Sequence, residues 1–544
     1  MKTTQIKTLV WMLFLSILLP LSCKKPIPKN LSQESIIPLP ANIKLPENVI
    51  PEPANISKDE QVYSGFELLK DCKVLFDGNQ NELERIATPF FNQIRKTTKF
   101  PIPFENLNAN KLEGNIYIGI SPTVKEEEGY NLEIKNDRII LLAKNPSGIF
   151  YGMQTLMQLL PDEIESQSAI IQDPIIVACG IIDDYPRYAY RGAMLDVSRH
   201  FLPSEDVKTY IDQIAKYKIN YLHLHLSDDQ GWRIEIKSWP KLTEIGGSTE
   251  VGGGKGGYFT QEQYKDIVNY AKDHFITIVP EIDMPGHTNA ALASYAELNC
   301  DNKATKLYTG IDVGFSSLCV KKDITYKFID DVIRELSEIT PGPYIHIGGD
   351  ESHSTPHDDY ITFIDKIAPI VKKYNKKMIG WEEVATANID QNTICQYWKS
   401  DSIANIASKK NAQIIYSNAK HCYLDMKYDT KTPLGLHWAG YIDVKTSYDW
   451  DPNTISPEIP EQSIAGIEAP IWTETIKNLK DLDFLAFPRI ISIAEIGWTP
   501  KEKRNWEGYK KRLGDQYNRL KARNINFYKS EEIPWKIQDN KINK

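Results

Sequence analysis

The sequence has few cysteines, no surplus of basic charge and no C-x-x-C pair. Seven cysteines are scattered over 544 residues, so we predict neither a small disulfide-built scaffold nor a cysteine metal cluster or redox motif. Lysine and arginine number 64 against 72 aspartates and glutamates, and the net charge of −8 offers no electrostatic footprint for nucleic acid. With 41% hydrophobic and 25% charged residues, the composition is that of a globular protein and excludes a multi-span membrane protein. Aromatic residues are plentiful, with 11 tryptophans and 28 tyrosines.

The N-terminal residues are predicted to be export signals rather than folded structure. An apolar run at residues 9–21 follows two lysines and is shorter than a membrane span of about 20 residues, which is typical of a secretory signal. The run ends in Leu21-Ser22-Cys23, which resembles the lipobox of bacterial lipoproteins; an ordinary cleaved signal is the alternative. We therefore expect residues 1–23 to be a lipoprotein signal with Cys23 lipidated, so that the exported protein is anchored by lipid alone at the periplasmic or cell surface. Residues 24–54, rich in Pro, Asn, Ser and Lys, are predicted to be a tether.

Export also bears on the remaining cysteines. A bridge between Cys300 and Cys319 is possible in an exported protein. Buried free thiols are the ordinary state of such scattered cysteines, so the sequence leaves this question open.

Residues 55–184 are predicted to form a small accessory domain. Residues 115–120 and 134–142 alternate apolar and polar side chains like half-buried strands. Residues 148–160 place apolar side chains at helical spacing and stop at Pro161. Strands mixed with helices over about 130 residues indicate a compact α+β domain.

From residue 185 onward the pattern predicts an α/β fold, a (β/α)₈ TIM barrel with a C-terminal helix in residues 185–544. Short apolar runs alternate with amphipathic stretches, and eight such units over about 340 residues match this fold. Helices are expected at residues 204–218, 260–274, 326–339 and 360–374, with a capping box of Thr260 and Gln263. The links after the sixth and seventh runs are less clearly helical. The eight predicted strands are 190–197, 221–226, 276–282, 344–347, 377–381, 393–398, 413–417 and 463–471.

Functional residues of such a barrel lie at the carboxyl ends of its strands, and polar or aromatic residues follow every run. The combination of carboxylates, tryptophans and a few Arg or His residues suits a sugar, because hydroxyls need charged partners and the CH faces of a pyranose stack on indole. The segments that carry these residues are 191–200, 228–233, 280–287, 348–351, 381–383, 398, 423–425 and 472–474.

Several of these residues have plainer explanations. His223 and His225 alternate on one strand face, but without a nearby carboxylate in the sequence we favour hydrogen bonding inside the barrel over a metal pair. Asp350-Glu351 could be an N-cap pair, yet the two glycines before it predict a tight turn that exposes both carboxylates. The glycine-rich stretch 246–257 lacks the P-loop pattern, so we expect a flexible loop near the mouth of the site.

These motifs together resemble glycoside hydrolase family 20, the exo-acting β-N-acetylhexosaminidases. The resemblance covers the whole barrel, and the α+β region looks like the small domain that usually precedes it. The matching segments are RGAMLDVSRHF, HLHLSDDQGWRIEI, GGSTEVGGGKGGYFTQEQY, VPEIDMPGH, HIGGDE, GWEE, YLD and IWTE.

The resemblance implies substrate-assisted retaining hydrolysis of terminal β-linked GlcNAc or GalNAc, an exception to the scheme with two protein carboxylates. Glu351 would be the general acid/base, and the carbonyl oxygen of the substrate's own 2-acetamido group the nucleophile. Asp350 would orient the acetamido N–H and stabilise the oxazolinium intermediate, with a large effective molarity for the internal nucleophile. Two adjacent carboxylates also help to raise the pKa of one of them.

The remaining roles also follow from the resemblance. Arg191 and Glu474 would hold the hydroxyls of the terminal sugar with help from Asp425, and Tyr423 would bond the acetamido oxygen. Trp381, Trp398 and Trp472 would wall the pocket, while Asp228, Asp283 and His287 would form a polar network beside Glu351, with Asp229 as an alternative to Asp228. No cofactor and no metal are implied, and the expected partners are glycans that contain N-acetylhexosamine or chitooligosaccharides.

Two other functions compete with this interpretation. An endo-chitinase would use two protein carboxylates, but the fourth run lacks a DxxDxDxE motif. A non-catalytic carbohydrate-binding lipoprotein would not need the intact Asp350-Glu351 pair. Subsites beyond the terminal sugar would depend on the long loops 295–315 and 434–460.

Overall fold

The computed structural model describes residues 39, 43–57, 64–107, 112, 114–166, 171 and 174–537. The predicted signal with Cys23, and the first part of the predicted tether, lie outside these residues. Over the described ranges, no helix has both the length and the apolarity needed to cross a membrane.

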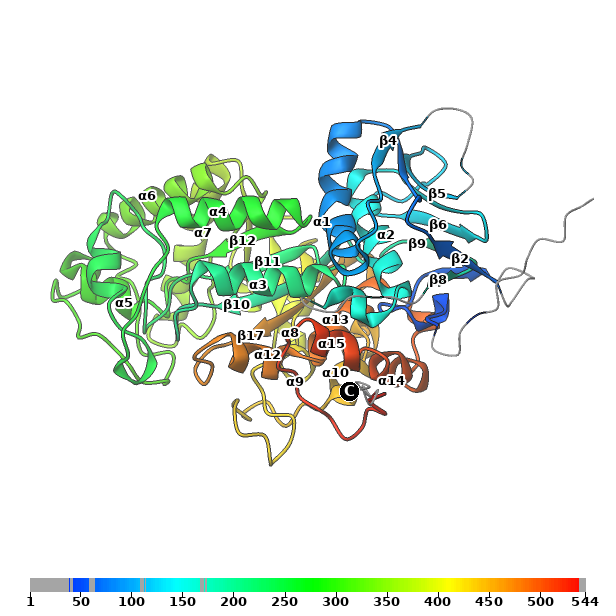
Figure 1. Ribbon diagram of the computed structural model, residues 1–544. Helices are drawn as coiled ribbons and strands as arrows, with labels where there is room; N and C mark the ends of the chain where they lie inside the picture. Colours follow the sequence, from blue (N-terminus) through cyan, green and yellow to red (C-terminus); the bar gives the residue numbers. More distant parts are fainter. Residues whose placement is uncertain are drawn as a thin grey trace, which may run out of the picture. The chain divides into compact units, whose positions relative to one another are not determined.

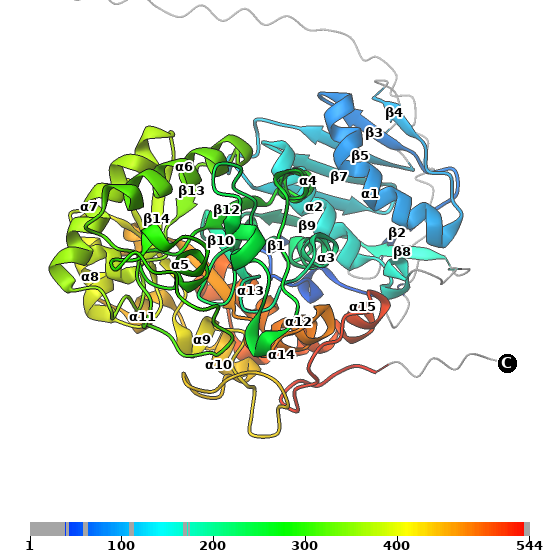
Figure 2. The same ribbon diagram turned by 90° about the vertical axis from the view of Figure 1, so that its left-hand side faces the viewer.

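The predicted α+β region is built on a mixed seven-stranded sheet in the order β1-β9-β6-β7-β5-β3-β4, with β2 (Gly65–Leu68) and β8 (Ile175–Ala178) paired separately. Helices α1 (Gln80–Thr98) and α2 (Pro146–Leu159) pack together against it, and α2 is buried almost throughout (Figures 1 and 2). The sheet strands are β1 (Asn55–Ser57), β3 (Val74–Asp77), β4 (Phe104–Asn106), β5 (Asn115–Ile120), β6 (Tyr130–Lys135), β7 (Arg138–Ala143) and β9 (Gly180–Asp184).

The structure corrects two predictions in this region. The single strand expected at 134–142 is a hairpin, because the chain turns at Asn136-Asp137 and Lys135 pairs with Arg138. The expected tether is packed at its end: Pro46–Asn48 forms a 3₁₀ helix, and Val49 and Ile50 are fully buried. The side chain of Gln158 bonds both the N–H and the C=O of Ile50, at 3.0 and 2.7 Å.

The rest of the chain contains a closed barrel of eight parallel strands in sequence order, which confirms the predicted fold. Each apolar run supplies one strand, and nearly every strand residue is buried because side chains fill the interior as well as the outer face. The strands are β10 (Tyr190–Asp196), β11 (Tyr221–His225), β12 (Thr277–Glu281), β13 (Tyr344–His346), β14 (Lys377–Trp381), β15 (Ile394–Tyr397), β16 (Gln413–Tyr416) and β17 (Ile464–Ile471).

Helices cover the barrel where the amphipathic pattern predicts them, and Thr260 and Gln263 form the expected capping box. The link after β15 is a nine-residue helix, whereas the link after β16 has only short helices. Figure 1 shows α3 and α4 running along the strands, and Figure 2 faces the side on which α5 lies. The helices are α3 (Ser204–Ala215), α4 (Gln261–Asp273), α5 (Asn289–Ser294), α6 (Asp323–Ile339), α7 (His357–Lys373), α8 (Asp401–Lys409), α9 (Ala419–Cys422), α10 (Val444–Tyr448), α11 (Pro452–Ile455), α12 (Leu479–Ala486), α13 (Arg489–Trp498), α14 (Trp506–Gly514) and α15 (Tyr517–Ala522).

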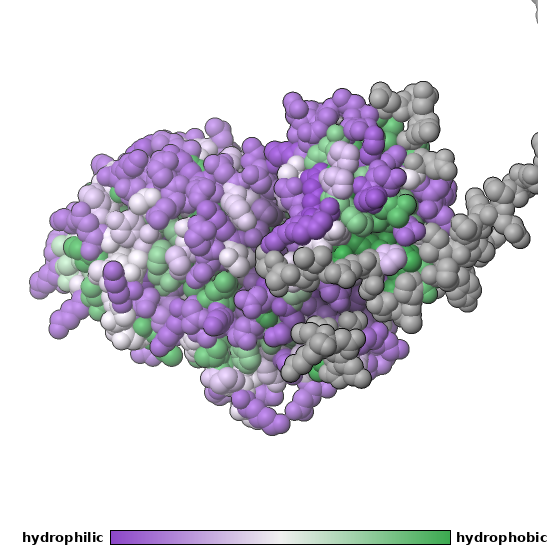
Figure 3. All heavy atoms as spheres, viewed as in Figure 1, coloured by the Kyte–Doolittle hydropathy of each residue, from purple (hydrophilic) through white to green (hydrophobic). Residues whose placement is uncertain are grey.

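Polar contacts join the small domain to the barrel at the end where the strands begin. Arg191, the second residue of β10, pairs with Glu128 of the small domain at 2.8 Å. Lys218, just before β11, pairs with Asp184 at 2.9 Å, and both side chains are fully buried. At the opposite end of the barrel, the carboxyl ends of the strands continue into loops. Figure 3 shows polar side chains over most of the visible barrel surface, with apolar ones in small groups.

The open question about Cys300 and Cys319 is answered by a disulfide between them. It closes the long loop that follows α5. Cys72, Cys395 and Cys422 are buried thiols.

Candidate active site

A cavity of about 260 Å³ opens among the loops at the carboxyl ends of the strands. Its lining combines titratable, aromatic and aliphatic side chains from the segments that follow β10, β12, β13, β15, β16 and β17. The titratable residues are Arg199, His287, Asp350, Glu351, Lys399 and Glu474, and the others are Ile311, Val313, Trp398, Tyr423, Leu436, Trp438 and Trp472.

The turn after β13 places Asp350 and Glu351 in this cavity. Gly348 and Gly349 have φ values of 67° and 100°, which glycine adopts most readily. A Cβ atom on Gly348 would lie 1.8 Å from Oδ1 of Asp283, so only glycine fits there. Asp283 accepts the N–H of Gly349 at 3.1 Å. The predicted tight turn is therefore present, and Asp283 supports it.

Asp350 is a buried carboxyl group with an unusual pKa. Its side chain is almost entirely covered, and Oδ1 has no hydrogen-bond partner among the described residues. Burial, with Glu351 beside it, raises the pKa of Asp350 to about 6. A buried, unpartnered acceptor that ionises near neutrality suits a ligand N–H or a developing positive charge.

His287 connects the carboxylate pair to Asp228. Nε2 of His287 lies 3.8 Å from Glu351 and 3.9 Å from Asp350, while Nδ1 lies 3.2 Å from Oδ1 of Asp228. Although burial opposes the charge, the carboxylates of Asp228, Asp283 and Asp350 hold the pKa of His287 well above its usual range. His287 is therefore a cation that faces both acidic residues of the turn.

The structure distinguishes Asp228 from Asp229. Asp228 bonds His225 and pairs with Arg199 at 2.7 Å, which holds its pKa well below the usual range despite burial. Asp229 instead accepts from the hydroxyl of Ser316 and the N–H of Asn289, so it anchors the loop and α5. Asp228 therefore bonds His287 directly in the network beside Glu351, whereas Asp229 approaches Nδ1 of His287 only at 3.9 Å and mainly holds the loop and α5.

Beneath this network the predicted hydrogen bonding of His223 and His225 is confirmed. His223 lies between Glu468 and Glu281, at 2.9 and 3.0 Å, and His225 lies between Glu281 and Asp228. Each ring nitrogen faces a carboxylate, and although burial opposes the charge, these carboxylates raise the pKa of His223 to about 9 and that of His225 to about 10. His346 and Glu281 lie close enough to share an ion with His223, but this arrangement of donors favours imidazolium rather than metal ligation.

Aromatic side chains form one wall of the cavity. Trp398, Tyr423 and Trp472 belong to one packed cluster, with the rings of Trp398 and Tyr423 nearly parallel at 6.5 Å. Trp381 belongs to the same cluster but is fully buried, does not line the cavity and donates its N–H to Glu281 at 2.9 Å. Its predicted place in the pocket wall is therefore wrong: it lies behind Trp472 and supports it.

Asp425 and Glu474 supply further carboxyl groups. The backbone nitrogen of Trp472 lies 3.4 Å from Oδ1 of Asp425, to which it donates. Oδ2 of Asp425 and Oε2 of Glu474 are buried without a hydrogen-bond partner among the described residues. Burial and the other carboxyl group raise the pKa of Asp425 well above its usual range. Glu474 lines the cavity, so its unpartnered oxygen suits a sugar hydroxyl, whereas Asp425 is not among the lining residues.

The predicted role of Arg191 is wrong. Arg191 lies at the start of β10, at the end of the barrel that faces the small domain, and pairs with Glu128. The arginine at the cavity is Arg199, which lies beyond the end of the same strand and has its guanidinium 4.7 Å from the ring centre of Trp472. Functional residues of a barrel lie after the strands, and Arg199 follows β10 whereas Arg191 stands near its start.

Loops complete the cavity with residues that the sequence could only place in general terms. Ile311 and Val313 come from the loop 295–315, and Leu436 and Trp438 from the loop 434–460. Trp438 was not predicted; its side chain is 55% exposed and meets Trp398 edge-on at 6.1 Å.

The glycine-rich stretch has hydrogen bonds at both of its ends. Arg233 donates to the carbonyls of Gly247, Thr249 and Gly257. The N–H of Gly252 in turn bonds Thr309 of the neighbouring loop at 2.8 Å.

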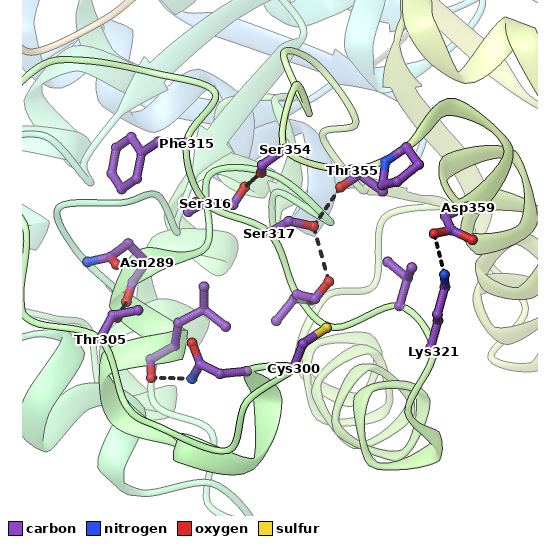
Figure 4. Close-up of a pocket in the computed structure, with 15 residues that line it drawn as sticks. Asn289, Cys300, Thr305, Phe315, Ser316, Ser317, Lys321, Ser354, Thr355 and Asp359 are labelled. Carbon is purple, nitrogen blue, oxygen red and sulfur yellow. Dashed lines mark hydrogen bonds and ion pairs between the residues drawn. The ribbon is translucent and has the colours of Figure 1, made fainter.

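A second cavity of about 470 Å³ lies beside the disulfide (Figure 4). Its polar side chains bond one another: Ser317 with Thr355 at 2.6 Å, and Lys321 with Asp359 at 2.9 Å. None of the predicted site residues lines it.

Comparison with known proteins gives a consistent result. The model of the catalytic domain of glycosyl hydrolase family 20 matches residues 188–360 and 353–501, and that of the family's domain 2 matches residues 46–185. A β-N-acetylhexosaminidase of Cellulomonas fimi is 38% identical over 412 residues, which cover 75% of this chain and 82% of that protein. The GH20 β-N-acetylhexosaminidase of Streptomyces coelicolor superposes with a TM-score of 0.87 at 45% identity and covers 91% of this chain and 100% of its own. A mutant Streptomyces plicatus β-hexosaminidase in complex with its product GlcNAc has a TM-score of 0.87 at 46% identity, over 91% of this chain and 99% of its own.

Proposed function

Because the chain belongs to glycosyl hydrolase family 20, we propose that it is an exo-acting β-N-acetylhexosaminidase that uses the 2-acetamido group of its substrate as the nucleophile. The substrates are glycans or chitooligosaccharides with a terminal, non-reducing β-linked GlcNAc or GalNAc. The observation that supports this most directly is the adjacent pair Asp350-Glu351 at one cavity, where one carboxyl group is buried and unpartnered and the other lies at the more open side.

In the first step, Glu351 protonates the glycosidic oxygen while the acetamido carbonyl oxygen attacks the anomeric carbon. Asp350, as a carboxylate, accepts the acetamido N–H and stabilises the positive charge that spreads over the forming oxazolinium ring. Glu351 then removes a proton from the water that opens the ring, so the configuration of the anomeric carbon is retained. The cation at His287 lies between the two carboxyl groups and limits their mutual repulsion.

The rest of the cavity binds the terminal sugar. Arg199 and Glu474 line the cavity and provide a donor and an acceptor for hydroxyl groups, and Asp425, which is not among the lining residues, contributes a further buried oxygen without a partner among the described residues. Trp472, Trp398 and Tyr423 provide apolar faces for the ring and the acetamido methyl group. Tyr423, which lines the cavity, donates its hydroxyl to the acetamido oxygen in this proposal.

Hydrolysis of an aryl β-N-acetylglucosaminide by the wild type, Glu351→Gln and Asp350→Asn tests the assignment. We expect both variants to lose about 10²–10⁴-fold in kcat, since one removes the general acid and the other the charge-stabilising carboxylate. No turnover of GlcNAc or GalNAc aryl glycosides by the wild type would reject the enzyme assignment. A thiazoline analogue of the oxazolinium should inhibit strongly, and indifference to it would reject the substrate-assisted mechanism.

We also propose that the protein is an exported lipoprotein anchored through Cys23. The support comes from the sequence alone, from the short apolar run and the Leu-Ser-Cys ending. Cys23→Ala should release the protein from the membrane fraction, and retention of the variant would contradict lipidation.

A further inference from the structure

Two glutamates that follow β14 have no role in the proposed reaction. Trp381 ends the strand, and Glu382–Thr386 continue as a 3₁₀ helix. The carboxylate of Glu382 accepts the backbone N–H groups of Trp398, Lys399 and Ser400, the first at 2.9 Å. Glu382 therefore fixes the backbone where β15 ends.

Glu383 acts on the side chain of the same tryptophan. Its Oε2 accepts the indole N–H of Trp398 at 3.2 Å, and the described residues offer no other acceptor to that group. Tyr423, Trp438 and the ammonium of Lys399 contact the ring through its faces and edge. Those contacts restrict where the ring lies, and the hydrogen bond adds a directional constraint on how it is turned within the pocket.

We propose that Glu383 is a positioning residue that holds the Trp398 indole as a fixed wall against the acyl part of the substrate's 2-acetamido group. The proposal rests on the proposed function. Trp398 lies next to the reacting atoms only if the substrate's acetamido group is the nucleophile. An internal nucleophile works only if its carbonyl oxygen stays within attack distance of the anomeric carbon. A wall that turns would let the acyl group leave that position while the sugar stays bound.

The charge state of Glu383 agrees with this role. Burial, together with Asp350 and Glu382, raises the pKa of Glu383 to about 8. At neutral pH the group is therefore an uncharged acceptor, and it adds no second negative charge beside Asp350. A glutamine amide is a close substitute, because its oxygen can accept the same indole N–H.

The test compares Glu383→Ala with Glu383→Gln on substrates that carry an N-acetyl or a larger N-propionyl group. For Glu383→Ala we expect kcat/KM on the N-acetyl substrate to fall by about 10–10²-fold, since a displacement of about 1 Å has effects of this size. The ratio of kcat/KM for N-propionyl over N-acetyl should rise, because the wall can now turn. Glu383→Gln should keep both values near those of the wild type.

The ratio is the decisive measurement, because it does not depend on the fraction of folded enzyme. Asp483→Asn is the matched control: burial raises the pKa of that carboxyl group to about 6, but it lies on α12 and does not line the cavity. An unchanged ratio in Glu383→Ala, or a loss in Glu383→Gln as large as in Glu383→Ala, would overturn the positioning role.

A double-mutant cycle with Trp398→Phe gives a second, independent outcome. Phenylalanine keeps an aromatic wall but has no N–H, so adding Glu383→Ala to it should cost little further activity. Full additivity of the two losses would show that Glu383 does not act through Trp398. No hydrolysis by the wild type would reject the proposed function together with this role, whereas an active wild type with an unchanged ratio would reject the role alone.

Discussion

Asp350 is the residue whose environment bears most directly on the pH dependence of catalysis. Its pKa of about 6 means that the carboxylate forms only as the pH rises through that value. Since the oxazolinium needs the ionised form, we expect kcat/KM to fall as the pH is lowered below about 6. This acidic limb of the pH profile should be absent from the residual activity of Asp350→Asn. A pH profile of kcat/KM measures it, and a limb that persists in the variant would assign the titration to another group.

The same pKa predicts a conflict between stability and function at this residue. A carboxyl group whose pKa is raised in the folded state costs stability that builds up as the pH rises from the ordinary aspartate value of 3.8 to about 6, and the cost is fully present above about pH 6. Asp350→Asn removes this cost and should raise the free energy of unfolding at pH 7 by about 1–3 kcal/mol. The gain should shrink below pH 4, where the aspartate is protonated in both states; denaturant unfolding at pH 7 and pH 4 would measure it.

Arg199 and Arg191 provide a matched pair of substitutions. Arg199→Met removes the guanidinium from the cavity and leaves the buried carboxylate of Asp228 without its 2.7 Å partner, so activity per folded molecule should fall by about 10²-fold or more. Arg191→Met breaks the contact with Glu128 at the other end of the barrel and should lower the melting temperature while kcat stays near the wild-type value. The reverse result would restore Arg191 as the sugar-binding residue.

At the scale of elements, amphipathic helices and apolar strands were predictable because their burial patterns repeat along the chain. The hairpin at Asn136-Asp137 was not predicted, although residues 135–138 are four consecutive polar residues that interrupt the alternation and include two favoured turn residues. Glu351 and Asp350 were predictable because they stand after a strand and two glycines. Trp438 was not, since its place depends on how a long loop folds back over Trp398.

The loop between Cys300 and Cys319 is the element on which the cavity mouth most depends. The disulfide closes a segment that carries Ile311 and Val313 at the cavity and Ser316 on Asp229. Replacing both cysteines by serine should lower stability by about 2–4 kcal/mol, as for other loops of this length. Because Ser316 still holds one end of the loop, we expect KM to rise more than kcat falls.

Denaturant unfolding with and without a reducing agent, together with steady-state kinetics, measures both effects. A double serine variant as stable as the wild type would show that the bridge does not contribute to the free energy of unfolding, and an unchanged KM would show that it does not hold the loop at the cavity.

In the whole molecule, the small domain and the barrel are joined through charges that water does not reach. Lys218 pairs with Asp184 at 2.9 Å and lies 3.0 Å from the hydroxyl of Tyr130, and both members of the pair are fully buried. Asp184 also accepts the indole N–H of Trp498, at 2.9 Å, so one carboxylate ties β9 to both α13 and the start of β11. Such a network connects the two domains into one folding unit without touching the cavity.

Lys218→Met tests this connection, because it leaves the carboxylate of Asp184 buried without its cation. The free energy of unfolding should fall by about 3–5 kcal/mol, the usual result of removing one partner of a buried pair. Adding Asp184→Asn should recover part of the loss, since the uncompensated charge is then removed as well. Unfolding curves of the two single variants and the double variant measure the coupling, and additive losses would show that the pair contributes nothing as a pair.

Since the pair lies at the end of the barrel opposite the cavity, kcat of the folded variant should equal that of the wild type, and a lower kcat would mean that the small domain influences the active site through the barrel.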